Sequence, residues 1–167
     1  MKIPICTFDA KTGILCAKCE SKLRLGQLKQ ADVEGAIKLT KLADRNQDVN
    51  KFTMMGAAKV NGDFVLILRG PDISVLRSNA MLSTKFENEF QSKVWFVEAE
   101  ATDKRFIENL FFPMRVLTVN LIWLPDGSKL TRVQVAANSN NSESKDTIEK
   151  IKKIAKEIRN IELLVEF

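Results

Sequence analysis

The sequence has 167 residues, of which 45% are hydrophobic and 28% are charged, and its formal net charge is +5. This length and composition predict one medium domain or two small ones with a buried core, and they exclude a disordered chain. No apolar run is long enough to cross a membrane, and the first residues lack the long apolar region of a signal peptide, so we expect a cytoplasmic protein without a membrane partner.

The residue types that are absent also argue against catalysis. The chain has no histidine and no tyrosine. This removes the usual general base at neutral pH and every Ser-His or Cys-His nucleophile pair. A lysine or a carboxylate could serve instead, but no motif arranges them. We therefore expect no catalytic activity and no small-molecule substrate.

All three cysteines lie near the start of the chain, at Cys6, Cys16 and Cys19. With Asp9 they form a C-x2-D pair followed by a C-x2-C pair, and Gly13 between the pairs suits a turn. Zinc binds four tetrahedral ligands, usually thiolates or imidazoles and less often a carboxylate, so these four residues are a candidate zinc site. Such a zinc would be structural, because no open position or base accompanies it. The alternative is that Cys16 and Cys19 are buried small side chains or a disulfide, and that Asp9 caps a turn.

Positive charge is concentrated in the same segment. Residues 1–29 contain six Lys or Arg residues against two carboxylates, a balance of +4. A basic bias at one end suggests a polyanionic partner, and a closed knuckle of chain could hold its cations against phosphates. The candidate phosphate-binding residues here are Lys11, Lys18, Lys22 and Arg24. The alternative is an ordinary solvated surface, which is also how we interpret the lysines near the C-terminus.

The next seventy residues show a pattern of one helix, two strands, a further helical segment and a strand. Helical spacing of apolar residues predicts a helix, and Asn61-Gly62 between two apolar runs predicts a β-hairpin. The segment that follows could be one helix or two around Ser78-Asn79. The expected elements are a helix at 31–45, strands at 52–60 and 64–69, helical structure at 71–90 and a strand at 93–99.

The same order of elements then recurs in the remainder of the chain. Thr102 is a typical N-cap for the next helix, and Pro125-Asp126-Gly127 is a typical turn between two strands. Residues 138–144 are polar and are expected to form a loop. The expected elements are a helix at 103–112, strands at 115–124 and 130–136, a helix at 145–160 and a strand at 161–167.

Three stretches resemble one known family. An αββαβ unit of this size is similar to a type II KH domain, and two in tandem resemble the KH region of the transcription elongation and termination factor NusA. The resemblance is to the archaeal NusA-like KH family. It is carried by KIPICTFDAKTGILCAKCESKL, by VWFVEA with the later LFFPMRVLTVNLIWLPDGS, and by IEKIKKIAKEIRNIELLVEF, which together cover nearly the whole chain.

The resemblance implies how RNA would be bound, and it also shows departures from the family. A KH domain contacts RNA through a G-x-x-G loop between two helices. The corresponding stretch in the first unit is Arg77-Ser78-Asn79-Ala80, which lacks both glycines but leaves Arg77, Ser78 and Asn79 as donors to phosphate. The corresponding region of the second unit, within or just after residues 138–145, also lacks glycine. The family has a cysteine at the position of Asp9, and a carboxylate there lowers the affinity for a soft metal site.

We therefore predict an α+β fold of two KH type II-like αββαβ units that pack together, at 31–100 and 101–167, preceded by a zinc-knuckle-like segment at 1–30. The expected function is that of a non-catalytic RNA-binding or ribonucleoprotein-associated factor of the NusA-like class. Its expected partners are RNA and either RNA polymerase or a ribosomal subunit. The alternative is a protein-binding scaffold that docks on the ribosome or on RNA polymerase and has lost KH-type RNA binding.

Overall fold

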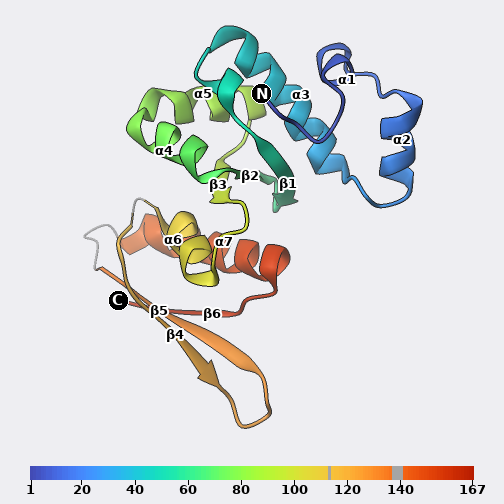
Figure 1. The fold of residues 1–167 in the computed structure, drawn as a ribbon. Helices are drawn as coiled ribbons and strands as arrows, with labels where there is room; N and C mark the ends of the chain where they lie inside the picture. The colour runs from blue at the N-terminus through green and yellow to red at the C-terminus, as the bar shows by residue number, and fades with distance from the viewer. Residues whose placement is uncertain (113, 137–140) are drawn as a thin grey trace. The chain divides into compact units, whose positions relative to one another are not determined.

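The computed structural model describes residues 1–112, 114–136 and 141–167. The chain divides into two compact units, Met1–Glu100 and Ala101–Phe167, and each is an α+β structure built around a three-stranded sheet (Figure 1). Among these residues, none of the helices combines the length and the apolar character needed to span a bilayer.

The first unit contains the predicted αββαβ order, preceded by two short helices that were not predicted. Its sheet has the order β1-β2-β3, with β1 and β2 antiparallel and β2 and β3 parallel. Its elements are α1 (Thr7–Thr12), α2 (Ala17–Arg24), α3 (Gln30–Arg45), the 3-10 helix η1 (Val49–Lys51), β1 (Met54–Val60), β2 (Asp63–Leu68), α4 (Gly70–Ser78), α5 (Ala80–Phe90) and β3 (Val94–Glu98).

The β1–β2 hairpin turns where the Asn-Gly pair predicted it. Asn61 and Gly62 both have positive φ, at 50° and 84°, which is the conformation of a type I′ turn. The helical stretch that follows β2 is two helices rather than one, because the chain leaves the helical conformation at Asn79 (φ −132°, ψ 93°). The α4–α5 junction therefore lies within residues 77–80.

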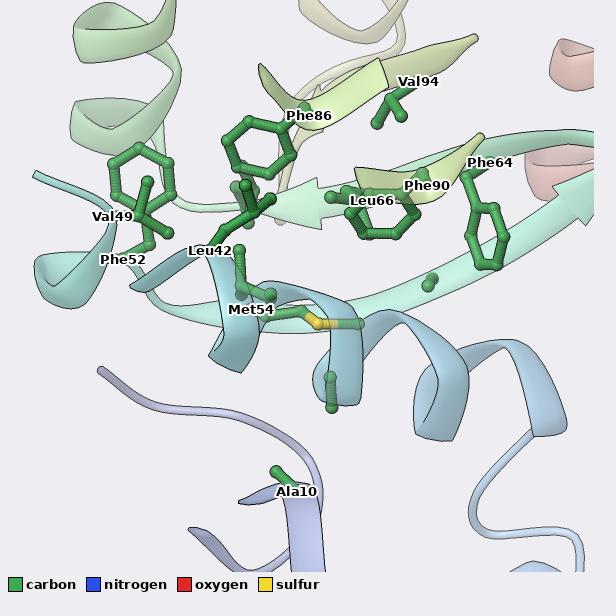
Figure 2. Packing of buried hydrophobic residues seen from close by; sticks show 14 of the residues in the cluster. Ala10, Leu42, Val49, Phe52, Met54, Phe64, Leu66, Phe86, Phe90 and Val94 are labelled. Carbon is green, nitrogen blue, oxygen red and sulfur yellow. The ribbon is translucent and has the colours of Figure 1, made fainter. Parts of the chain in front are cut away.

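The core of the first unit is rich in aromatic rings (Figure 2). Phe86 on α5 lies at its centre, with ring centroids 6.4 Å from Phe52, 6.1 Å from Phe90 and 5.2 Å from Phe96. Ala10 of α1 and Cys19 of α2 are buried in the same hydrophobic cluster, as are Ile5 and Leu28. The N-terminal segment is therefore part of the first unit and not a separate appendage.

Three groups hydrogen-bond the outer edge of β1, which is an edge strand of its sheet. The Lys2 carbonyl accepts from the amide of Met54 at 2.9 Å. The carboxylates of Asp72 on α4 and Asp32 on α3 accept from the amides of Thr53 at 2.8 Å and Ala57 at 2.7 Å. Buried or partly buried backbone amides need such partners, and these three ties also fix both helices and the N-terminal segment to the strand.

The second unit has the predicted αββαβ order with the same pattern of strand pairing. Its sheet has the order β4-β5-β6, with β4 and β5 antiparallel and β5 and β6 parallel. The Thr102 hydroxyl caps the first helix by accepting from the Arg105 amide at 3.3 Å, as predicted. The elements are α6 (Asp103–Phe111), β4 (Val116–Trp123), β5 (Lys129–Val135), α7 (Asn141–Arg159) and β6 (Leu163–Glu166).

One boundary of the second unit was predicted wrongly. The polar stretch 138–144 was expected to be a loop, but α7 begins at Asn141, so 141–144 are helical; residues 138–140 lie outside the described part of the chain. Polar composition is a weak guide to the first turn of a helix, because that turn is commonly polar and exposed. The core of this unit is mainly aliphatic and comes from both helices and the sheet: Phe106, Ile107, Leu110, Phe111, Val133, Val135, Ile148, Ile151, Ile154, Ala155 and Leu163.

Candidate functional site

The N-terminal segment presents its cysteine pairs at the starts of two helices. Cys6 is the N-cap residue of α1, and Asp9 lies three residues later in the first turn. Cys16 is the N-cap residue of α2, and its sulfur accepts a hydrogen bond from the Cys19 amide at 3.5 Å. Each pair therefore consists of a helix N-cap residue and a residue of the first turn that follows it.

The turn between the two helices brings these pairs together. Gly13 ends α1 in the left-handed region (φ 77°), and its amide donates to the Asp9 carbonyl at 2.8 Å. The Asp9 carboxylate in turn accepts from the Cys16 amide at 3.1 Å, which ties the start of α2 to α1. A carboxylate can accept through both oxygens, so this bond leaves lone pairs for a cation.

The distances between the candidate ligand atoms suit a small tetrahedral ion. The Cys6 sulfur lies 3.6 Å from the Cys19 sulfur and 4.0 Å from the Cys16 sulfur. A tetrahedron with Zn–S bonds of about 2.3 Å has S···S edges of about 3.8 Å. The four ligand atoms, including one Asp9 oxygen, all lie within 4.8 Å of one another. Cys6, Asp9, Cys16 and Cys19 can therefore hold a metal ion, and the three cysteines are free thiols rather than a disulfide.

The close packing of these groups perturbs two of them. Hydrogen bonds from the Cys19 thiol and then from the Cys16 amide and thiol hold the pKa of Asp9 below its ordinary value. The pKa of the Cys19 thiol is raised to about 12: a hydrogen bond from the Cys6 backbone lowers it, but the Asp9 carboxylate, burial and the other two thiols outweigh that bond. Four acidic ligands this close together repel one another when ionised, and a divalent cation relieves that repulsion.

The basic residues predicted to bind phosphate fall into two groups on different elements. Lys11 lies on α1, and Lys18, Lys22 and Arg24 lie on α2; all are exposed except Lys22, which is half-buried. These four cations therefore belong to the same small segment as the candidate metal ligands.

The second group lies at the α4–α5 junction. Arg77, Ser78 and Asn79 are exposed there, and the Ser78 hydroxyl donates to the Val75 carbonyl at 2.9 Å. Figure 1 places α4 on the opposite side of the first unit from α1 and α2. The structure thus places the cations of the knuckle on α1 and α2 and the three junction residues on the other side of the unit, so the two groups do not form one patch.

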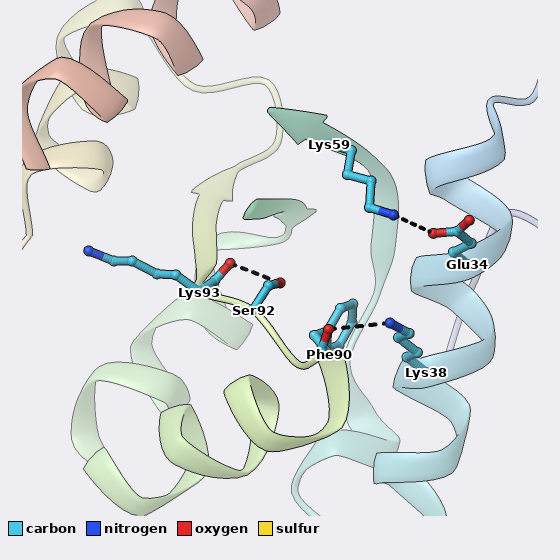
Figure 3. Close-up of polar contacts among 6 residues, drawn as sticks. All are labelled: Glu34, Lys38, Lys59, Phe90, Ser92 and Lys93. Carbon is cyan, nitrogen blue, oxygen red and sulfur yellow. Dashed lines mark hydrogen bonds and ion pairs between the residues drawn. The ribbon is translucent and has the colours of Figure 1, made fainter. Parts of the chain in front are cut away.

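Other lysines of the first unit are engaged within the unit (Figure 3). The Lys38 ammonium lies 5.1 Å from the ring centroid of Phe64 and 5.4 Å from that of Phe90, and it donates to the Phe90 carbonyl at 3.3 Å. Lys59 forms an ion pair with Glu34 at 3.2 Å. These cations stabilise the packing of α3 on the sheet and are poor candidates for binding phosphate.

Sequence reasoning missed one property of the knuckle. Phe8, Ile14 and Leu25 are large apolar residues whose exposed fractions are 75%, 75% and 73%. Phe8 lies on α1, Ile14 lies in the turn between α1 and α2, and Leu25 follows α2, so all three lie close in sequence to the candidate metal ligands. The two helices are too short for an apolar spacing to distinguish core-facing from exposed positions, so the sequence alone does not identify these three residues as exposed.

Neither a protein-family model nor a curated protein matches this sequence. The fold is similar to the crystal structure of APE1850, with a TM-score of 0.55 and 10% sequence identity over 77% of this chain and 95% of that chain. At this level of identity the likeness concerns the fold alone.

Proposed function

We propose that this chain is a non-catalytic RNA-binding factor of the NusA-like KH class, acting in transcription elongation or termination in the cytoplasm. RNA would be its direct partner, and RNA polymerase or a ribosomal subunit would be the larger assembly. The two units would be type II KH units, and the N-terminal segment would be a structural zinc knuckle.

The observation that carries this proposal is the arrangement shared by the two units. In each, a helix precedes an antiparallel hairpin, and further helical structure leads to a third strand parallel to the second. This is the αββαβ order of a type II KH unit. In the first unit the two helices that would flank the RNA-binding loop meet at Asn79.

The chemistry of the junction suits phosphate even without the family glycines. The first amides of α5 have no partners within that helix, and the helix dipole favours an anion there. Exposed Arg77, Ser78 and Asn79 precede these amides in the chain. Without glycine the backbone cannot approach the phosphate as closely, so we expect binding that is weaker than that of a KH domain with its glycines.

The zinc would act by ordering the knuckle. When bound, it would hold the N-termini of α1 and α2 together through Cys6, Asp9, Cys16 and Cys19. The chain's own contribution is to keep Lys18, Lys22 and Arg24 on a rigid α2, where they can contact phosphates without first losing conformational entropy. One carboxylate in place of a thiolate makes this site weaker than a four-cysteine site.

The test is the binding of a labelled single-stranded RNA, measured by fluorescence anisotropy at several salt concentrations. We expect a dissociation constant of roughly 1 μM or weaker at physiological salt, with affinity falling as salt rises. Replacing Lys18, Lys22 and Arg24 together with Ala should lower the affinity and flatten the salt dependence. Replacing Arg77, Ser78 and Asn79 together with Ala should lower it as well.

The matched control removes the same charge from another helix. Lys152 and Lys156 on α7 form ion pairs with Glu149 and Glu162, and replacing them and Lys153 with Ala should change RNA affinity least. An equal loss in all variants would mean that only net charge matters. No binding of the unmodified protein at low salt would contradict the proposal.

The exposed apolar residues of the knuckle favour a second candidate function, that of a protein-binding scaffold docking on RNA polymerase or the ribosome. Phe8, Ile14 and Leu25 are each at least 73% exposed and belong to one short segment of the chain. Large exposed apolar side chains mark interaction sites when they gather in one region. A pull-down with and without ribonuclease discriminates: a scaffold keeps its protein partner after RNA is digested and loses it when Phe8 and Leu25 are replaced with Ser.

A further inference from the structure

Strand β4 has an open edge that its sheet leaves unpaired. In the order β4-β5-β6 it pairs on one side with β5, and within the described residues no strand lies along its other side. The Leu124 amide donates to the Ser128 carbonyl across the hairpin at 2.9 Å. Because backbone groups alternate along an antiparallel strand, the amides and carbonyls of Val119, Leu121 and Trp123 face the open edge.

The side chains along this edge are apolar and exposed. The exposed fractions are 50% for Leu117, 55% for Leu121 and 63% for Trp123. The Lys129 ammonium lies 4.5 Å from the Trp123 ring centroid and helps hold the indole against the hairpin. Figure 1 shows the tip of the β4–β5 hairpin reaching beyond α6 and α7. Helix packing therefore leaves this part of the strand uncovered.

Proteins normally protect such an edge, and the equivalent strand of the first unit is protected. The edge of β1 is tied by Lys2, Asp32 and Asp72, and the strand carries a charge at Lys59. Residues 116–124 contain no charged residue. The irregularity in β4 lies at its start, between Val116 and Thr118, so the remainder is a regular strand. An uncharged, regular and apolar edge is a template for pairing with another strand.

The charges at the two ends of β4 indicate which strand that is. Arg115 precedes the uncharged stretch, and Asp126 follows it. A second copy of β4 running antiparallel brings the positive end of each strand to the negative end of the other. In the register centred on Asn120, Val119 of one copy faces Leu121 of the other. The start of β4, which Arg115 precedes, then lies at the Asp126 end of the other copy.

We propose that β4 is a self-association edge, through which two copies of this chain pair antiparallel and form one continuous sheet. The occupant is a second copy because the same strand supplies the unpaired backbone groups, the apolar rows and the complementary end charges. This inference is independent of RNA binding and of metal binding.

The first test is sedimentation equilibrium of the full chain over a range of concentrations. We expect a monomer–dimer equilibrium. Leu121→Pro should raise the dissociation constant of the dimer about tenfold or more, because it removes an amide that faces the open edge and leaves the β4–β5 hydrogen bonds in place. Leu121→Lys should act similarly by placing a charge on the apolar row of each copy, while the control Leu164→Lys adds the same charge on β6 and should leave the constant unchanged.

A second test uses the end charges. Arg115→Glu and Asp126→Lys should each weaken self-association, because each places like charges together at both ends of the paired strands. A mixture of the two variants should recover it as a heterodimer in which every end is complementary.

Hydrogen exchange of the unmodified protein provides a readout that needs no variant. The amides of Val119, Leu121 and Trp123 should become protected as protein concentration rises. A protein that is monomeric at every concentration, a dimer unaffected by both Leu121 variants, or an edge that takes up an extended peptide of another protein while the chain stays monomeric would each overturn the proposal.

Discussion

The two units share one topology, but their first strands differ in how the outer edge is treated. In the first unit, β1 receives a backbone carbonyl from Lys2 and carboxylates from α3 and α4. In the second unit, β4 has the same place in the sheet, and its outer backbone groups have no such partner among the described residues. The strand order alone therefore does not determine whether an edge strand is available to pair with a further strand. That depends on whether groups from other elements already hydrogen-bond its outer backbone groups.

The first unit also carries additions that have no counterpart among the described residues of the second. Two short helices stand at its start, and a break at Asn79 divides the helical stretch between its second and third strands. The two short helices place candidate metal ligands at their N-termini, and the break places polar residues at the N-terminus of α5. The two units therefore differ in their additions and in how their edge strands are tied, and the following experiments test what each of these differences contributes to stability.

The largest expected effect comes from the aromatic core of the first unit. Replacing Phe86 with Ala removes a fully buried ring that contacts three others, and we expect the free energy of unfolding of this unit to fall by about 3–5 kcal/mol. Trp95 lies in the first unit and Trp123 in the second, so Trp95 fluorescence in a Trp123→Phe background reports the urea midpoint.

The aliphatic core of the second unit provides the comparison. Ile151→Val removes one methylene from a fully buried side chain and should cost about 0.5–1.5 kcal/mol. If Phe86→Ala costs no more than Ile151→Val, the aromatic cluster is not the main source of stability in the first unit.

Metal removal should have the next largest effect, again on the first unit. If zinc is present at about 100 times its dissociation constant, chelation should lower the free energy of unfolding by about 2.7 kcal/mol. Because Ile5, Ala10 and Leu28 pack in the core of this unit, loss of the knuckle should be seen in the thermal midpoint reported by Trp95 and in faster proteolysis of residues 1–29.

Three variants assign that effect to the four proposed ligands. Cys16→Ser and Cys19→Ser should reduce the zinc content measured by elemental analysis and abolish the response to chelator. Asp9→Cys should raise zinc retention, because it completes a four-thiolate site. Full zinc content in Cys16→Ser would exclude this site.

A smaller effect should follow from uncovering the edge of β1. Asp32 accepts hydrogen bonds from the amides of Lys29 at 2.9 Å and Ala57 at 2.7 Å. Asp32→Ala leaves both without a partner, and we expect a loss of about 1–3 kcal/mol in the free energy of unfolding. Exchange of the Ala57 amide should become faster and approach the rate of the β4 edge amides in the monomer. Asp44→Ala, on the exposed side of the same helix, is the control and should change neither quantity.

Local signals in the sequence were sufficient for most of the fold. Asn61-Gly62, Thr102 and Pro125-Asp126-Gly127 were assigned correctly because each acts through its own neighbours in the chain. The candidate metal cluster was found for the same reason, since each C-x2 pair consists of a helix N-cap and a residue of the following turn. Helices α1 and α2 were missed because they are too short for an apolar period to be recognised.

The features that the sequence did not reveal depend on contacts between distant residues. The bond between Asp32 and Ala57 has no signal in the sequence, because it needs the hairpin to lie against α3. The open edge of β4 was invisible for the same reason, because the sequence alone does not say which strand ends a sheet. RNA binding by Lys18, Arg24 and Arg77 stays a prediction, as does the packing of the two units into one body.

The smallest expected effect lies at the tip of the β4–β5 hairpin. The Asp126 carboxylate accepts hydrogen bonds from the Ser128 hydroxyl at 2.6 Å and the Ser128 amide at 2.9 Å, and these bonds lower its pKa below the ordinary value. Because the pKa is lower in the folded state, the resulting stability is present above the unfolded-state value of about 3.9 and is lost as pH falls through the folded-state value.

Within one copy of the chain, this exposed turn stabilises only the hairpin tip, in contrast to the carboxylates that tie β1 to two helices. Asp126→Asn should therefore change the thermal midpoint of the second unit only slightly at neutral pH, and the difference from the unmodified protein should shrink below about pH 4. The amide chemical shift of Ser128 should follow the titration, with a midpoint below the ordinary value for an aspartate, and the pH-dependent step should disappear in Asp126→Asn. A step at the ordinary value would show that these bonds do not persist in solution, and the hairpin tip would then depend on Pro125 and Gly127 alone.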